Sequence, residues 1–107
     1  MPGRRRGARR RRARFIGFDA SPDRPLAESV AEFVQRLEKL EPGVYMTVEH
    51  PGLDVPEMRA MGHPGYENVA ANRQRVTDIF TSPEVMAVVE AKGIKLVTFR
   101  DLAQRER

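Results

Sequence analysis

Two strand-like segments, residues 44–49 and 94–99, constrain the fold more than any other feature of the sequence. Both are rich in β-branched residues, and helical patterns fill the chain between them. Strands connected through helices run parallel, and parallel strands need neighbours on both sides and cover on both faces. Two strands, or three if residues 15–18 form one, are too few for an independently stable sheet. The sequence therefore predicts the last units of a larger α/β domain, followed by a polar tail at 100–107.

The first predicted helix begins near residue 26, where apolar residues start to recur at three- and four-residue steps. Asp23 is placed to cap this helix, and Pro25 suits its first turn because the missing N–H would have no partner there. Pro42 and Gly43 end the helical pattern. The apolar stripe consists of Leu26, Val30, Phe33, Val34, Leu37 and Leu40.

Further helices are predicted between the two strand-like segments. Residues 67–80 carry apolar side chains at helical spacing, and a shorter helical turn is expected at 57–61. The next helix has a clear start, with Ser82 as its N-cap and Pro83 as its first residue. Gly93 is placed to end it, because glycine readily adopts the left-handed conformation found after a helix.

The charge of the chain is divided unevenly. The net charge is +4, but residues 1–14 contain eight of the 19 basic residues and no acidic one, so residues 15–107 carry eleven basic against 15 acidic side chains. The sequence thus divides into a basic arm, 1–14, and a mildly acidic body, 15–107. The arm consists mainly of Arg, Gly and Ala, and we expect it to be disordered. Its arginines are Arg4, Arg5, Arg6, Arg9, Arg10, Arg11, Arg12 and Arg14.

Composition excludes several classes of protein. Without cysteine, the chain has no disulfide and no thiolate metal site. No run approaches the roughly 18 apolar residues of a membrane span, so we expect no membrane partner. The N-terminus lacks the apolar stretch of a secretory signal and the serines of a transit peptide. A cytoplasmic location is therefore expected.

His50 is the more informative of the two histidines. It ends a predicted strand, where (β/α) barrels place catalytic side chains, and Pro51 and Gly52 form a sharp turn after it. The alternative is a histidine that only ends the strand and hydrogen-bonds its loop. His63 begins a second His-Pro-Gly tripeptide, which is expected to be a loop turn. Three carboxylates near the histidines could add metal ligands, at a spacing that matches no zinc motif: Glu49, Asp54 and Glu57.

A series of short motifs surrounds and follows these histidines. They are EHPG at 49–52, PEMRAMGH at 56–63, GYENVA at 65–70, NRQ at 72–74, TD at 77–78, TSPEV at 81–85 and GIKLVTFRDL at 93–102. This ordered series resembles the C-terminal part of the YdjC-like (ChbG) carbohydrate deacetylases. The resemblance covers residues 17–102 approximately.

The resemblance implies a fold and an activity. The family has a deformed (β/α) barrel and removes acetyl groups from N-acetylated amino sugars such as chitooligosaccharides, with a divalent metal, Mg or Zn. It is a family of hydrolases of the amide C–N bond. An early Asp pair and two histidines of its first half serve the metal and the general base. A late histidine in a His-Pro-Gly motif acts as general acid or stabilises the oxyanion. That position is His50 here, with Pro51, Gly52 and His63 in the adjoining substrate loops.

The sequence also departs from this family. It has no Asp-Asp pair, and the two metal-binding histidines have no counterparts. Asp19 follows a strand-like run but aligns with a later part of the family, so it is not assigned to the metal. A (β/α) barrel usually needs about 250 residues. We therefore expect a C-terminal fragment of a barrel, inactive and without metal when alone, with exposed apolar surface that favours self-association.

The basic arm leaves two other interpretations open. Eight arginines predict a salt slope of about −7 on duplex DNA, which is typical of a nucleic-acid or anionic-surface binder. However, the arm has no aromatic residue for base stacking, and the acidic body would repel a duplex. Nucleic acid is thus the alternative partner to an N-acetylated oligosaccharide. The arm is also consistent with a misplaced start or a shifted frame in arginine-rich coding sequence.

Overall fold

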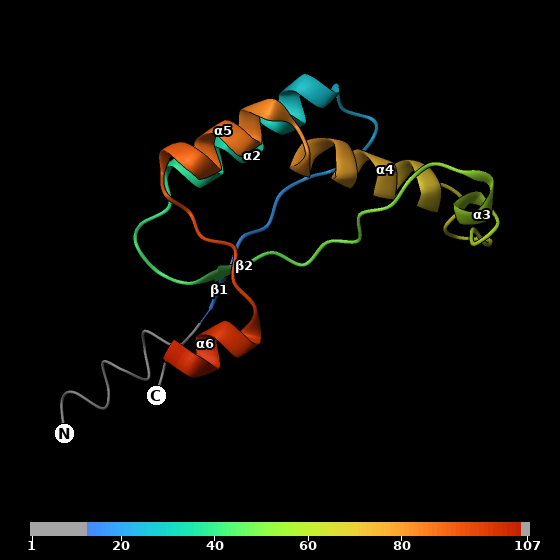
Figure 1. The fold of residues 1–107 in the computed structure, drawn as a ribbon. Coiled ribbons are helices and arrows are strands. Elements are labelled where there is room, and N and C mark those ends of the chain that lie inside the picture. The colour runs from blue at the N-terminus through green and yellow to red at the C-terminus, as the bar shows by residue number, and fades with distance from the viewer. Residues whose placement is uncertain (1–12, 106–107) are drawn as a thin grey trace.

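The computed structural model describes residues 13–105 and shows a mixed α/β chain that is mostly helical (Figure 1). The elements within these residues are β1 (Arg14–Phe15), α2 (Leu26–Glu38), β2 (Tyr45–Met46), α3 (Pro56–Arg59), α4 (Val69–Phe80), α5 (Pro83–Ala91) and α6 (Phe99–Arg105). None of the helices in this range is long and apolar enough to span a membrane.

The two strands form a parallel β–α–β unit with α2 as the crossover. Arg14 lies opposite Tyr45 in the register of the pair. The Arg14 N–H donates to the Val44 carbonyl at 2.9 Å, and the Ile16 N–H donates to the Met46 carbonyl at 2.9 Å. The strands predicted at 15–18 and 44–49 are therefore much shorter than expected, because hydrogen bonding stops after these few residues and the chain continues extended but unpaired.

The strand predicted at 94–99 is wrong. This segment has no β partner among the described residues, and Phe99 already belongs to α6. Leu96 is 89% exposed, so β propensity alone does not hold the segment in a sheet. The parallel partner of β2 is instead β1.

The C-terminal segment predicted as a polar tail is helical. The Asp101 N–H donates to Thr98 Oγ1 at 3.1 Å, and the Thr98 N–H donates to Asp101 Oδ2 at 2.9 Å. This reciprocal pair is a capping box that satisfies two backbone donors at the start of α6. The Thr-Phe-Arg-Asp sequence carries its signature and could have predicted the helix.

The ends of α5 are formed as its sequence predicts. Ser82 Oγ accepts the Val85 N–H at 3.4 Å, and Pro83 is the first helical residue. Gly93 has a φ of +66°, and the Ile94 N–H donates to the Val89 carbonyl at 2.9 Å. This is a Schellman C-cap, which requires a residue that tolerates the left-handed conformation. The cap predicted at Asp23 is wrong, because the N-cap of α2 is Pro25 and no side chain caps it.

The core lies where α2 and α5 pack side by side and the C-terminal end of α4 meets them (Figure 1). Its buried members are Val30, Phe33, Leu37, Ile79, Val85 and Val88. Ile79 is completely buried. Phe33 also meets two other rings, Phe18 at a centroid distance of 4.5 Å and Phe80 at 5.3 Å. Phe18 comes from the segment after β1, so this aromatic cluster fastens that segment to the helices.

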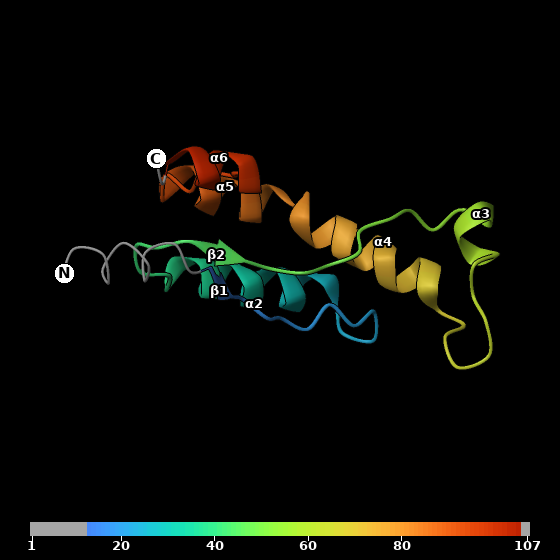
Figure 2. The same ribbon diagram turned by 90° about the horizontal axis from the view of Figure 1, so that it is seen from below.

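The described helices do not all belong to one bundle. α3 and α6 stand apart from the bundle of α2 and α5 (Figures 1 and 2). Large apolar side chains remain exposed on β1 and around α6, among them Phe15 at 71% and Phe99 at 74%. The described residues thus form one core, which lies between α2, α5 and the end of α4.

Candidate active site

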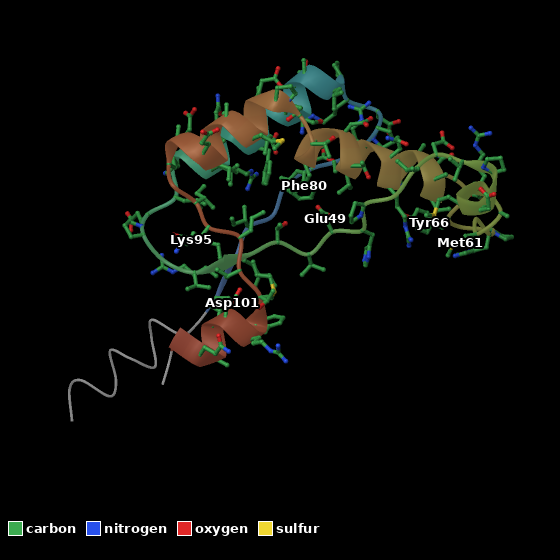
Figure 3. All side chains as sticks on the ribbon, in the orientation of Figure 1. Glu49, Met61, Tyr66, Phe80, Lys95 and Asp101 are labelled. Atoms are coloured by element: carbon green, nitrogen blue, oxygen red, sulfur yellow. The ribbon has the colours of Figure 1, made fainter. Side chains whose placement is uncertain are left out.

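A cleft of about 320 Å³ lies where the extended segments leave β1 and β2. This volume is within the usual range of small-ligand sites. Figure 3 shows Glu49 on the segment after β2 and Tyr66 on the loop before α4. The cleft is lined by Phe18, Asp19, Ala20, Ser21, Pro22, Glu49, His50, Tyr66, Asn72, Arg73 and Val76.

Parallel pairing explains why distant residues meet in this cleft. The carboxyl ends of parallel strands lie at one edge of a sheet, which is where α/β proteins place their ligands. Asp19 follows β1 and His50 follows β2, and both line the cleft. The structure therefore adds Asp19 to the candidate site. The signal in the sequence was an acidic residue directly after the first strand-like run.

The loop that carries Asp19 is held by backbone and ionic contacts. The Ser21 N–H donates to Asp19 Oδ1 at 2.8 Å, and Arg24 Nη1 lies 3.7 Å from Asp19 Oδ2. From α4, Arg75 Nη1 donates to the Arg24 carbonyl at 2.8 Å. These contacts, together with the aromatic cluster around Phe18, keep the loop against the helices.

Glu49 lies in a partly buried position beside His50. Burial raises the pKa of Glu49 above its ordinary value of 4.5, and the adjacent His50 partly offsets this by lowering it. The carboxyl group therefore holds its proton to a higher pH than an exposed glutamate does. A cleft with such a group can exchange protons with a ligand.

The His-Pro-Gly turn at 50–52 packs directly on α4. The Gly52 N–H lies 2.9 Å from Thr77 Oγ1 and 3.1 Å from the Arg73 carbonyl. The Gly52 carbonyl accepts from Thr77 Oγ1 at 2.7 Å. His50 itself is exposed at the cleft, so its imidazole is accessible to a ligand.

The second His-Pro-Gly tripeptide forms a loop turn, as the sequence predicts. The His63 and Tyr66 backbones exchange hydrogen bonds of 3.2 and 2.8 Å, and Gly65 has a φ of +95°. His63 is exposed, and its Nδ1 lies 2.9 Å from the Pro64 carbonyl. His63 does not line the cleft, although Tyr66 does. The structure thus brings Pro51 and Gly52, but not His63, next to His50.

Two polar side chains of α4 complete the cleft. Asn72 and Arg73 both line it. Arg73 Nε is buried and has no hydrogen-bond partner among the described residues. Because Nε is buried, a ligand in the cleft would have to bind Arg73 through the other N–H groups of its guanidinium.

The described residues show no cluster of metal-ligand side chains. Within 13–105, no group of three or more His, Asp or Glu side chains is arranged to hold a metal ion. Of the metal-ligand candidates in the sequence, only Glu49 and His50 share the cleft. Asp54 instead pairs with Arg59, whose Nε lies 2.6 Å from Asp54 Oδ1. The divalent metal of the YdjC-like family therefore does not fit the side chains described here.

Most of the basic arm lies outside the described residues, and this includes Arg4, Arg5, Arg6, Arg9, Arg10, Arg11 and Arg12. Arg14, predicted to be part of the arm, is the first residue of β1. Its guanidinium carbon lies 5.9 Å from the centre of the Tyr45 ring, in a cation–π arrangement. The described residues thus include the last arginine of the arm.

Comparison with known proteins gives no family to which the chain can be assigned. No protein-family model, curated protein or solved structure matches it.

Proposed function

We propose that the body of this chain is the C-terminal part of a YdjC-like carbohydrate deacetylase, and that its cleft binds an N-acetylated amino sugar. The observation that carries the proposal is the meeting of His50 and Asp19 in one cleft after parallel strands. This is where a (β/α) barrel has its active site. The ordered motifs between residues 49 and 102 support the same assignment.

In this proposal, His50 is the proton donor. Hydrolysis of the acetamide breaks the C–N bond, and the departing amine has to take up a proton. An exposed imidazole at the end of a fastened turn can deliver it. The terminal guanidinium N–H groups of Arg73 are donors for an oxygen of the sugar or its acetyl group. Aromatic Tyr66, which is 37% exposed, provides a face on which a sugar ring can stack.

The activation of water is not assigned to these residues. In the family that task falls to a metal site, and the described side chains do not fit one. We therefore propose that residues 13–105 supply ligand binding and the acid group only. On this proposal, the isolated chain releases no acetate from chitooligosaccharides, and measured turnover would refute that part.

The proposal is tested by the binding of N,N′-diacetylchitobiose to the whole chain, measured by isothermal titration calorimetry. Cellobiose, which lacks the acetamido groups, is the matched control ligand. His63→Asn is the matched control variant for His50→Asn, because both histidines begin the same tripeptide. The replacement keeps a polar side chain of similar size.

We expect diacetylchitobiose to bind and cellobiose to bind at least tenfold more weakly. His50→Asn should weaken diacetylchitobiose binding about tenfold, which corresponds to the loss of one hydrogen bond of about 1.4 kcal/mol. His63→Asn should leave the affinity unchanged, since His63 is outside the cleft. Absence of binding, or equal effects of the two variants, would contradict the proposal.

A further inference from the structure

The turn after His50 is fastened to α4 mainly by one side chain. Thr77 Oγ1 donates to the Gly52 carbonyl at 2.7 Å and accepts the Gly52 N–H at 2.9 Å. The Arg73 carbonyl is a second acceptor for this N–H, at 3.1 Å. Both backbone polar groups of Gly52 are therefore bound to a single turn of the helix, in a partly buried position.

Gly52 lies so close to α4 that a side chain would not fit easily. A Cβ atom at this position would lie 3.0 Å from Met58 Cε and 3.2 Å from Arg73 Cβ. Both distances are shorter than ordinary carbon–carbon contact. The contact between the turn and the helix is thus a packed junction and not only a pair of hydrogen bonds.

Pro51 transmits this constraint to His50. The proline ring fixes its own φ, and it restricts the preceding residue to extended backbone conformations. Once Gly52 is bound to α4, few backbone conformations remain for His50. We infer that Thr77 is a positioning residue that holds His50 at the cleft, an inference that rests on the proposed function of that cleft.

The second His-Pro-Gly tripeptide shows what the turn does without such a contact. A Cβ atom at Gly65 would meet no atom within 4 Å, and His63 is exposed away from the cleft. The tripeptide alone therefore does not place a histidine in a site. The difference lies in the hydroxyl group of Thr77 and the close approach of Gly52 to α4.

The test compares three variants of the whole chain. Thr77→Val removes the hydroxyl group and keeps the shape of the side chain, and Thr77→Ser restores a hydroxyl group. Thr81→Val is the matched control. Thr81 Oγ1 donates to the Thr77 carbonyl at 2.7 Å, one turn later on the same helix face, and makes no hydrogen bond to the turn.

The first measurement needs no sugar. Hydrogen exchange of the Gly52 amide and the imidazole NMR signals of His50 are recorded for each variant. In Thr77→Val we expect exchange at Gly52 to rise about tenfold and the His50 signals to shift, with wild-type values in Thr77→Ser and Thr81→Val. Unchanged Gly52 exchange and His50 signals in Thr77→Val would overturn the inference, even if that variant were less stable.

A further variant covers the case in which Thr77→Val does not fold. Gly52→Ala perturbs the same junction from the side of the turn, through the contacts with Met58 and Arg73. It should shift the same His50 signals, and unchanged signals would again overturn the inference.

The second measurement is the affinity for N,N′-diacetylchitobiose. Thr77→Val should weaken it about tenfold, whereas Thr77→Ser and Thr81→Val should leave it unchanged. Equal affinity of wild-type and Thr77→Val would overturn the positioning role and leave the proposed function intact. Absence of binding by the wild-type chain would refute the proposed function, while the sugar-free measurement would still decide the role of Thr77.

Discussion

Replacement of Phe33 by leucine tests the aromatic cluster that connects the core to the cleft. Phe33 is only 4% exposed and contacts Phe18 at 4.5 Å and Phe80 at 5.3 Å between ring centroids. Leucine retains most of the buried apolar area but loses both ring pairs. Each such pair contributes about 0.5–1.5 kcal/mol beyond its area, so we expect the free energy of unfolding to fall by about 1–3 kcal/mol.

The matched control is Phe99→Leu, the same chemical change at a ring that is 74% exposed. There we expect a change within about 0.5 kcal/mol. Urea unfolding followed by far-UV circular dichroism gives both values, with all variants at one chain concentration because association would alter apparent stability.

A double-mutant cycle with Phe18→Leu separates the direct contact from general packing. We expect a coupling of about 0.5–1.5 kcal/mol between Phe18 and Phe33. A loss of stability in Phe33→Leu no larger than in Phe99→Leu would refute the role of the cluster. Zero coupling would show that Phe18, and with it the loop of Asp19, is not held by the Phe33 ring.

Other parts of the structure give four further predictions. Lys92 Nζ donates to the Glu38 and Leu40 carbonyls at 2.8 and 3.0 Å. Lys92→Met should therefore lower the free energy of unfolding by about 1 kcal/mol, and an unchanged urea midpoint would contradict this. Since the folded pKa of Glu49 is raised above 4.5, the contribution of Glu49 to stability should fall as pH rises from 4.5 through that pKa. Thermal melts should therefore show that the stability of Glu49→Gln relative to wild type rises from pH 4.5 to neutral pH, and a difference that does not change with pH would refute this. Exposed apolar side chains such as Leu96 should cause self-association, seen as a mass that rises with concentration in sedimentation; a monomer that unfolds cooperatively at all concentrations would contradict it. Any binding to duplex DNA should depend on residues 1–12. For their seven arginines, the logarithm of the binding constant should fall with the logarithm of the salt concentration with a slope of about −6. Binding that survives deletion of residues 1–12 in gel-shift assays would exclude this.

Local sequence signals predicted the helices well and the strands poorly. The apolar stripe of α2, the Ser82 cap and the Gly93 C-cap each depend on neighbouring residues, which the sequence displays directly. A strand depends on a partner, and residues 94–99 have none among the described residues in spite of their β-branched composition. The Thr98 and Asp101 capping box at the start of α6 is also a local signal, and it is present in the sequence although a polar tail was predicted there.

The candidate site was predictable in part. His50 could be selected because it ends a strand-like segment before a proline turn, and the structure places it at the cleft. Asp19 could not be joined to it from sequence, because their proximity depends on the parallel pairing of β1 with β2. The contacts of Thr77 and Arg73 with Gly52 span 20 residues or more of sequence, and no local pattern encodes them.

The cleft at His50 is proposed to bind an N-acetylated sugar, and this can be tested directly. The chain has only two histidines, so their imidazole signals can be followed together in one NMR sample during a titration with N,N′-diacetylchitobiose. We expect the His50 signals to shift and saturate while those of His63 stay in place. Signals that remain unchanged for both histidines, or that shift equally for both, would contradict it.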